Sequence, residues 1–307
     1  MTHIVFTSGG VGSWYAGTLV AREHGAANCR FLFTDTRSED GDLYRFLVES
    51  VAATTGRSAA CAALVRECRA IPEIGAPGFK DAVAAAQAQA RDLLPELVRL
   101  SDGRDLWELF ADEKMIGNTR VDICSRILKR DTGRKWIEAR FAPADCVLYF
   151  GIDGSERGRF EGARDKTGIA GRWLPYAARA PLCETGTTKC EMLKECERQG
   201  LDPVAIYDEG FPHANCGGFC VKGGQGQFAH LLRTRPAFFA YNARREQEFR
   251  DQSGKDVAVL RDRRGGTTKP LPMFEFQRQI ESGERVADPR DWGKGCQCFT
   301  PDSEATE

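Results

Sequence analysis

The chain begins with a short apolar segment that breaks at once into serine and glycine. Residues 3–14 read HIVFTSGGVGSW, in which Ile4, Val5 and Phe6 predict a buried strand. Residues 14–24 carry apolar side chains at helical spacing and end at Gly25, a natural helix stop. In this order of strand, loop and helix, backbone N–H groups point into one small volume. The segment therefore predicts an anion site, for phosphate above all.

Apolar strand segments and helical segments continue to alternate after this motif. Residues 29–34 (CRFLFT) predict a second strand, and residues 42–51 predict a helix with one apolar face. Residues 145–152 (DCVLYFGI) are almost wholly apolar, which is typical of an internal strand in a parallel sheet. This order predicts an α/β fold, a Rossmann-like doubly wound parallel sheet with its ligand at the carboxyl ends of the strands.

Three further segments predict helices. Residues 81–100 are rich in alanine and are expected to form one long helix with a kink at Pro95. Asp105 and Glu108 form the pattern of a capping box at the start of LWELF. Residues 188–199 predict another helix, beyond a change in composition near residue 180. We therefore expect an α/β domain over residues 1–180, which contains the anion-binding loop, and a smaller Cys-containing region over residues 181–307.

Composition limits the classes of partner and the compartment. The formal net charge is −1 among 307 residues, so a basic site must come from local placement of charge. The start of the chain lacks the pattern of a signal peptide, and no apolar run approaches the ~20 residues of a membrane span, so we expect a cytoplasmic protein with no membrane partner. Twelve cysteines in a reducing compartment indicate burial, metal or cluster binding, or redox chemistry rather than disulfides.

The opening loop excludes two familiar phosphate motifs and resembles a third. It lacks the Gly-Lys-Ser/Thr ending of Walker A and the G-x-G-x-x-G of dinucleotide-binding folds. Residues 8–13 (SGGVGS) resemble the SGGxxS loop of the PP-loop ATP pyrophosphatases, although many members carry Asp where this chain has Gly12. The resemblance implies that ATP binds with Mg²⁺, its adenine near residues 34–36 and its phosphates in the loop. The nucleotide-binding residues so expected are Ser8, Gly9, Gly10, Val11, Gly12, Ser13, Thr34, Asp35 and Thr36. Arg120 and Lys222 are added as nucleotide-binding cations that would balance the charge on ATP.

Segments of the second half resemble a branch of the same superfamily. Residues 206–220 (IYDEGFPHANCGGFC), 118–130 (NTRVDICSRILKR) and 151–159 (GIDGSERGR) resemble the phosphoadenylyl-sulfate (PAPS) reductase family. The NCGGFCVK segment and a CxC tail are similar to reductase-like proteins of phages, plasmids and other mobile elements. This resemblance implies cleavage of ATP between its α and β phosphates to adenylylate an acceptor, in sulfur or nucleic-acid modification. The implied partners are an adenine nucleotide and a nucleic-acid or protein acceptor, with a homodimer as a further expectation.

Two alternatives stay open. The reductases use a cysteine in a C-terminal Glu-Cys-Gly-x-His segment, whereas residues 295–299 read GCQCF with no following histidine. In a reductase reading, Cys296 or Cys298 would attack the sulfur of a sulfonucleotide. In a non-catalytic reading, Gly12 marks a degenerate loop in an accessory nucleotide-binding protein of a mobile-element system.

Charge on ATP must be balanced by side chains, since no Walker lysine is present. The basic segment 118–130 and its neighbours supply these cations. The residues expected to take part in catalysis are Ser13, Arg126, Lys129 and Arg157.

Cysteines in glycine-bearing loops are the candidates for a metal centre. Cys216 and Cys220, Cys296 and Cys298, with Cys124 as a rival ligand, could supply thiolates for zinc or a four-iron four-sulfur cluster. The alternative is that these loops hold free thiols.

Overall fold

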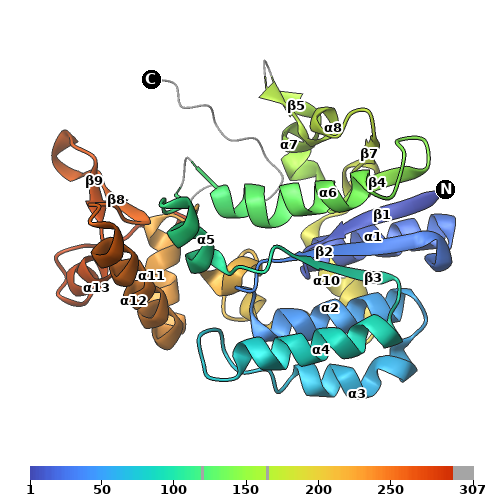
Figure 1. Cartoon of the computed structure of the whole chain (residues 1–307), viewed down its shortest axis with the longest axis horizontal. Helices are drawn as coiled ribbons and strands as arrows, with labels where there is room; N and C mark the ends of the chain where they lie inside the picture. The colour runs from blue at the N-terminus through green and yellow to red at the C-terminus, as the bar shows by residue number, and fades with distance from the viewer. Residues whose placement is uncertain (119–120, 164–165, 293–307) are drawn as a thin grey trace.

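The computed structural model describes residues 1–118, 121–163 and 166–292 (Figure 1). Its centre is a parallel sheet of five strands in the order β3-β2-β1-β4-β7. The strands are β1 (Thr2–Thr7), β2 (Cys29–Asp35), β3 (Leu97–Ser101), β4 (Cys146–Phe150) and β7 (Ala177–Arg179). The chain builds β1, β2 and β3 in one direction and then crosses back to place β4 on the other side of β1. This is a Rossmann-like α/β arrangement, as predicted, and its strand order reverses between β1 and β4.

Helices cover both faces of the sheet because successive residues of each strand point to opposite sides. Val5 and Phe31 belong to one core cluster, whereas Ile4, Phe6 and Leu32 belong to a second cluster. Figure 1 shows α6 on one side of the sheet and α2, α3 and α4 on the other. Helices associated with the first cluster are α1 (Val11–His24), α2 (Gly41–Thr54), α3 (Ser58–Cys68), α4 (Phe79–Leu93) and α10 (Lys189–Arg198). With the second cluster are associated α6 (Thr132–Glu138), α7 (Arg157–Glu161) and α8 (Ile169–Arg172). The π-helical turn η2 (Ser125–Asp131) precedes α6 and places Leu128 in the first cluster.

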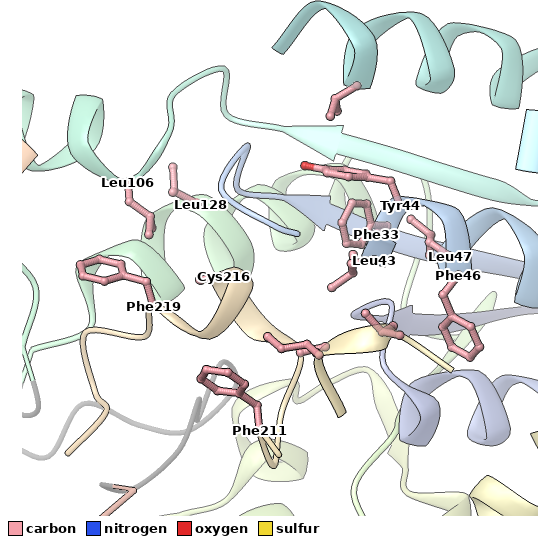
Figure 2. Packing of buried hydrophobic residues seen from close by; sticks show 14 of the residues in the cluster. Phe33, Leu43, Tyr44, Phe46, Leu47, Leu106, Leu128, Phe211, Cys216 and Phe219 are labelled. Carbon is pink, nitrogen blue, oxygen red and sulfur yellow. The ribbon is translucent and has the colours of Figure 1, made fainter. Parts of the chain in front are cut away.

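The first core cluster continues into the C-terminal half. It joins Trp14 of α1 to Met192 of α10, and Trp107 to Phe228 and Phe276. Figure 2 shows Leu106 and Phe219 near Cys216, with Phe33 and Leu43 packed at the contact of sheet and α2. The predicted boundary at residue 180 falls between β7 and α9 (Pro181–Thr185). The remaining elements are α5 (Leu106–Glu113), α11 (Gln225–Thr234), α12 (Pro236–Ser253), α13 (Met273–Glu281) and the hairpins β5 (Gly162–Ala163) with β6 (Lys166–Thr167) and β8 (Leu260–Asp262) with β9 (Lys269–Leu271).

One predicted helix is wrong in its second part. The alanine-rich segment forms α4 only as far as Leu93, and residues 97–101 form the edge strand β3. Pro95 lacks an N–H donor and restricts the residue before it, so it ends the helix rather than kinking it. The sequence LVRLS that follows then pairs with β2.

The predicted helix starts are confirmed at two capping boxes. Asp105 caps α5 with Glu108 at the third position, and Thr188 caps α10 with Glu191 in the same role. Each box satisfies backbone N–H groups that would otherwise lack a partner. The second box fixes where α10 begins, and so fixes the position of Lys189.

Candidate functional site

A hollow of about 180 Å³ lies where the strand order reverses. Its walls include the loop after β1, the loop after β4 and the segment around Pro212. In open α/β sheets, ligands bind at this position, outside the carboxyl ends of the two strands where the order changes. We call it the switch-point hollow; it is lined by Ser8, Gly10, Val11, Gly12 and Ser13, together with Gly151, Asp153, Glu156, Arg159, Lys189, Met192, Tyr207 and His213.

The N-terminus of α1 opens into this hollow without a side-chain cap. Gly10 is its N-cap residue and makes no side-chain hydrogen bond, and the first turn holds no acidic residue. The first amides of a helix have no partner within the helix and carry the positive end of its dipole. One of them, the Val11 amide, hydrogen-bonds to Tyr207. No carboxylate of the first turn therefore competes with a ligand anion for these amides.

Ser13 shapes the loop from inside. Its hydroxyl donates to the Gly10 carbonyl at 2.9 Å and accepts from the Ser8 amide at 3.0 Å. The side chain is buried. This bond pattern ties the glycine loop to the first turn of α1, so the Ser13 side chain is used within the protein to position that loop.

The two loops of the hollow touch backbone to backbone. A Cβ on Gly151 would lie 2.6 Å from Ser13 Cα and 2.8 Å from Ser13 N. Such distances are far below ordinary van der Waals contact. Gly151 is therefore required for the end of β4 to approach the glycine loop after β1 this closely.

Cationic side chains at the rim come from segments far along the chain. Lys189 Nζ donates to the Pro212 carbonyl at 2.9 Å and lies 4.4 Å from the centroid of the Tyr207 ring. Loss of solvent around its ammonium lowers the pKa of Lys189. The same loss of solvent, with Lys189 and Arg159 nearby, lowers the pKa of His213. The rim thus offers cations and a titratable ring to an anion that enters.

Two carboxylates line the same hollow. Asp153 follows β4 and accepts from the Ser155 amide at 2.8 Å, and Glu156 pairs with Arg159. Carboxylate oxygens are the protein ligands that Mg²⁺ prefers when it is bound with phosphates. Asp153 and Glu156 are therefore the residues that would hold a nucleotide-associated Mg²⁺ here.

A buried arginine fixes the segment that brings Tyr207 to the loop. Arg45 is almost fully buried in α2, pairs with Asp42 at 2.7 Å and donates to the Pro203 carbonyl at 3.2 Å. The Ala205 amide donates to Asp42 at 2.8 Å. These bonds tie the segment before Tyr207 to the helix that follows β2.

Three of the predicted nucleotide contacts are buried away from the hollow. Thr34, Asp35 and Thr36 are at most 5 % exposed, and none lines the switch-point hollow. Asp35 accepts two bonds from Arg99, at 2.7 and 2.9 Å, and one from Tyr44 at 2.8 Å. This carboxylate is thus bonded within the protein, at the end of β2.

Other cationic residues that were predicted for the site lie outside the switch-point hollow. Arg157 lies outside the hollow, where it pairs with Glu161 at 3.0 Å and is about half exposed. Lys222 lies in a different cavity, and Arg126 lies at a different hollow, described below. Arg120 lies outside the described residues.

A second, smaller cavity collects thiols around a buried ion pair. This thiol cavity, of about 20 Å³, is lined by Cys124, Cys216, Cys220 and Lys129 among others. Lys129 Nζ donates to Glu39 at 2.9 Å, and the other oxygen of Glu39 accepts from the Cys216 amide at 2.7 Å. Burial alone would lower the pKa of Lys129, but Glu39 and Cys216 outweigh it and raise that pKa. Lys129, predicted to be catalytic, is therefore paired here rather than at the glycine loop after β1.

Burial opposes ionisation of the thiols in this cavity. Burial raises the pKa of Cys124 to about 12 and raises that of Cys216 well above its ordinary value. Among the described residues, no group of three or more His, Cys, Asp or Glu side chains is arranged to hold a metal ion. The other two predicted ligands, Cys296 and Cys298, lie outside the described residues.

Comparisons with family models, with curated proteins and with solved structures found no match to this chain. Within the described ranges, no helix is both long enough and apolar enough to cross a membrane. The geometry of the switch-point hollow is therefore the basis on which its function is inferred.

Proposed function

We propose that this chain is a PP-loop ATP-binding protein that cleaves ATP between its α and β phosphates to adenylylate an acceptor. The observation that supports the proposal is the N-terminus of α1, whose N-cap residue Gly10 makes no side-chain hydrogen bond, at the point where strand order reverses and in one hollow with Lys189 and Arg159. Amides of a helix N-terminus and two cations suit the tail of a nucleoside triphosphate. The SGGVGS loop stands at this point, as in the family that it resembles.

In the proposed reaction, a nucleophile on the acceptor attacks the α phosphorus of ATP. The bond from that phosphorus to the oxygen bridging to the β phosphate breaks, and pyrophosphate leaves with the bonding electrons. The loop amides and Lys189 would stabilise the negative charge that develops on the leaving group. Mg²⁺ held by Asp153 and Glu156 would screen the charge of the phosphates.

Lys189→Ala is expected to weaken ATP binding by about tenfold, since a charge-assisted hydrogen bond is worth about 1.5–3 kcal/mol and the rim position screens part of it. Lys194 is exposed on the same helix α10 and does not line the hollow. Lys194→Ala should therefore bind ATP like the wild type. Calorimetric titration of the two variants measures the difference; equal affinities would remove Lys189 from the site.

ATP binding is expected to take up protons through His213. Its pKa is lowered in the unliganded chain, so the ring is neutral down to below its ordinary pKa of about 6.5. A bound polyanion raises that pKa again, so affinity gains from protonation as pH falls toward this range. Calorimetry in buffers of different ionisation enthalpy should show greater proton uptake for the wild type than for His213→Gln. The ATP phosphates titrate in the same pH range as histidine. The difference in proton uptake between wild type and His213→Gln is therefore diagnostic, and the absolute proton uptake is not.

The products distinguish the proposed reaction from its alternatives. ATP labelled at the α phosphate should give AMP or an adenylylated acceptor, with pyrophosphate released. ADP and phosphate would contradict the proposal. Binding of ATP without any cleavage would favour the alternative of a non-catalytic, accessory nucleotide-binding protein. Sulfite formed from a sulfonucleotide and a thiol donor would instead favour a reductase.

Zinc or a four-iron four-sulfur cluster at the thiol cavity stays a prediction. Cys124, Cys216 and Cys220 would supply thiolates, and ligands beyond the described residues would have to complete the set. Metal binding must displace the protons from these thiols, with proton release as a consequence. Metal content and the visible spectrum of anaerobically purified full chain test this: we expect bound metal that Cys216→Ser diminishes. Metal-free, colourless wild type would contradict it.

A further inference from the structure

A third hollow, outside both sites described so far, is lined mainly by arginine. It has a volume of about 290 Å³ and lies between η2, α6 and α8. Its charged residues are Arg126, Arg130, Asp131, Arg134 and Arg172. The lining thus holds four guanidinium groups and one carboxylate, and two further carboxylates, Asp122 and Glu138, pair with arginines of this hollow from outside it. We call this hollow the arginine groove.

The arginines form a row rather than a point. Arg126, Arg130 and Arg134 follow one another at intervals of four residues along the continuous helix made by η2 and α6, so they share a face. Eight residues of helix extend over about 12 Å. Like charges at this spacing destabilise a helix unless they are compensated. A row of this length suits a ligand with several phosphates better than a single small anion.

Neighbouring groups hold the row in place and compensate part of its charge. Arg130 pairs with Asp122 at 3.5 Å and Arg134 pairs with Glu138 at 3.1 Å, and neither carboxylate lines the groove. Arg134 also stacks on the buried Trp173, with its guanidinium carbon 4.3 Å from the ring centroid.

The remaining two arginines are the accessible ones. Arg126 and Arg172 are exposed. Arg134 donates to the Arg172 carbonyl at 2.8 Å, which joins α8 to α6 at the groove. Guanidinium groups bind phosphate oxygens in a bidentate manner, so a surface lined by arginine suits a phosphodiester backbone.

The groove lies on the helix that also borders the thiol cavity. Arg126 and Arg130 line the groove from η2. Lys129, on the same helical segment, lines the thiol cavity and pairs with Glu39. A polymer held in the groove would therefore run beside one of the two sites described above.

We infer that the arginine groove binds the phosphate backbone of a nucleic-acid strand. The claim that a nucleic acid is the acceptor rests on the proposed adenylyl transfer. The claim that the groove binds nucleic acid is tested separately. A strand carries a phosphate about every 3.4 Å of helix axis, so it can engage several arginines of the row at once. The groove is lined mainly by guanidinium groups, and the aromatic ring in its lining, that of Trp173, is buried and does not offer a face to a base. We therefore expect binding that is electrostatic and independent of sequence.

Fluorescence anisotropy of the full chain with a labelled single-stranded DNA of about 20 nucleotides, longer than common single-strand site sizes, tests the inference. Each neutralised phosphate contributes about −0.7 to the slope of log affinity against log salt, so four arginines predict a slope of up to about −2.8. The double variant Arg126→Gln/Arg172→Gln should lower the magnitude to about 1.4. Lys135→Gln, on the exposed side of α6 and outside the groove, should keep the wild-type slope.

Several results would overturn the inference. These are no binding, an unchanged slope in the double variant, or displacement of the DNA by tripolyphosphate or polyglutamate at equal charge concentration. The last outcome would mean a site for small anions or for acidic protein.

ATP titration of Arg172→Gln separates this inference from the proposed function. Arg172 lies outside the switch-point hollow, so this variant should bind ATP like the wild type. ATP binding without DNA binding overturns the groove alone. DNA binding without ATP binding supports the groove as a binding site and overturns the proposed function.

Discussion

Gly151→Ala is expected to abolish measurable ATP binding and to destabilise the fold. The added methyl group would lie 2.6 Å from Ser13 Cα, with the Ser13 amide nitrogen at 2.8 Å. Backbone cannot rotate away as a flexible side chain can, so β4 and the N-terminus of α1 must separate. Overpacking of this kind costs about 1–3 kcal/mol. The same separation would misalign the loop amides, which need near-ideal hydrogen-bond distances to hold phosphate.

The matched control is Gly154→Ala in the same loop. A Cβ on Gly154 would meet nothing within 4 Å, and its backbone has no left-handed torsion. This variant should keep both the melting temperature and the ATP affinity of the wild type. Thermal melting and calorimetry on both variants test the pair. Normal ATP binding by Gly151→Ala would show that the contact of the two loops is not needed for the site.

Lys129→Met is expected to cause the largest loss of stability of any single change considered. Lys129 and Glu39 are 6 % and 1 % exposed, and their Nζ and Oε1 atoms lie 2.9 Å apart. Removal of one partner from a buried ion pair costs about 3–5 kcal/mol because the other charge is left without compensation. Chemical denaturation should show this loss in the free energy of unfolding.

A double-mutant cycle separates the ion pair from simple packing. Glu39→Gln removes the carboxylate charge, so Lys129→Met/Glu39→Gln should be clearly more stable than the sum of the single losses predicts. Strict additivity, or a loss below about 1 kcal/mol for Lys129→Met, would contradict the role of the pair.

The Lys129–Glu39 pair also predicts how stability changes at alkaline pH. The pKa of Lys129 is raised in the fold, so its contribution is complete below the ordinary lysine pKa of about 10.4 and is lost as pH rises through the higher folded value. Wild-type stability should therefore fall more steeply in this alkaline range than that of the double variant.

Local patterns in the sequence were enough to predict the central fold. The apolar run before Ser8 and the apolar run before Gly151 are internal strands, and α5 starts at the predicted capping box of Asp105 and Glu108. These features depend on neighbouring residues, which a sequence displays directly. The edge strand β3 was missed because Leu97 to Ser101 adjoin an alanine-rich helix, and only pairing with β2 makes them a strand.

The switch-point hollow could be predicted only in part. The loop from Ser8 to Ser13 was visible because its chemistry is contiguous. Lys189 and Arg159 were missed because no spacing links them to that loop, and tertiary packing alone brings them there. Thr188 at the capping box was a signal for where α10 starts, yet it gave no sign of which face α10 turns to the loop.

The thiol cavity shows the same limit. Cys216 and Cys220 stand close in sequence, but Cys124 and the Lys129–Glu39 pair reach them only through packing between η2 and the end of β2. A sequence could suggest these residues as candidates, but not their separation from the phosphate loop.

Calorimetric titration of the full chain with ATP and with AMP, both in the presence of Mg²⁺, tests most directly whether the switch-point hollow holds a triphosphate tail. If it does, ATP should bind at least about tenfold more tightly than AMP, a difference of about 1.4 kcal/mol or more, because only ATP places β and γ phosphates against the amides of α1 and Lys189. Equal affinity for AMP and ATP, or no binding of ATP, would contradict the proposed site.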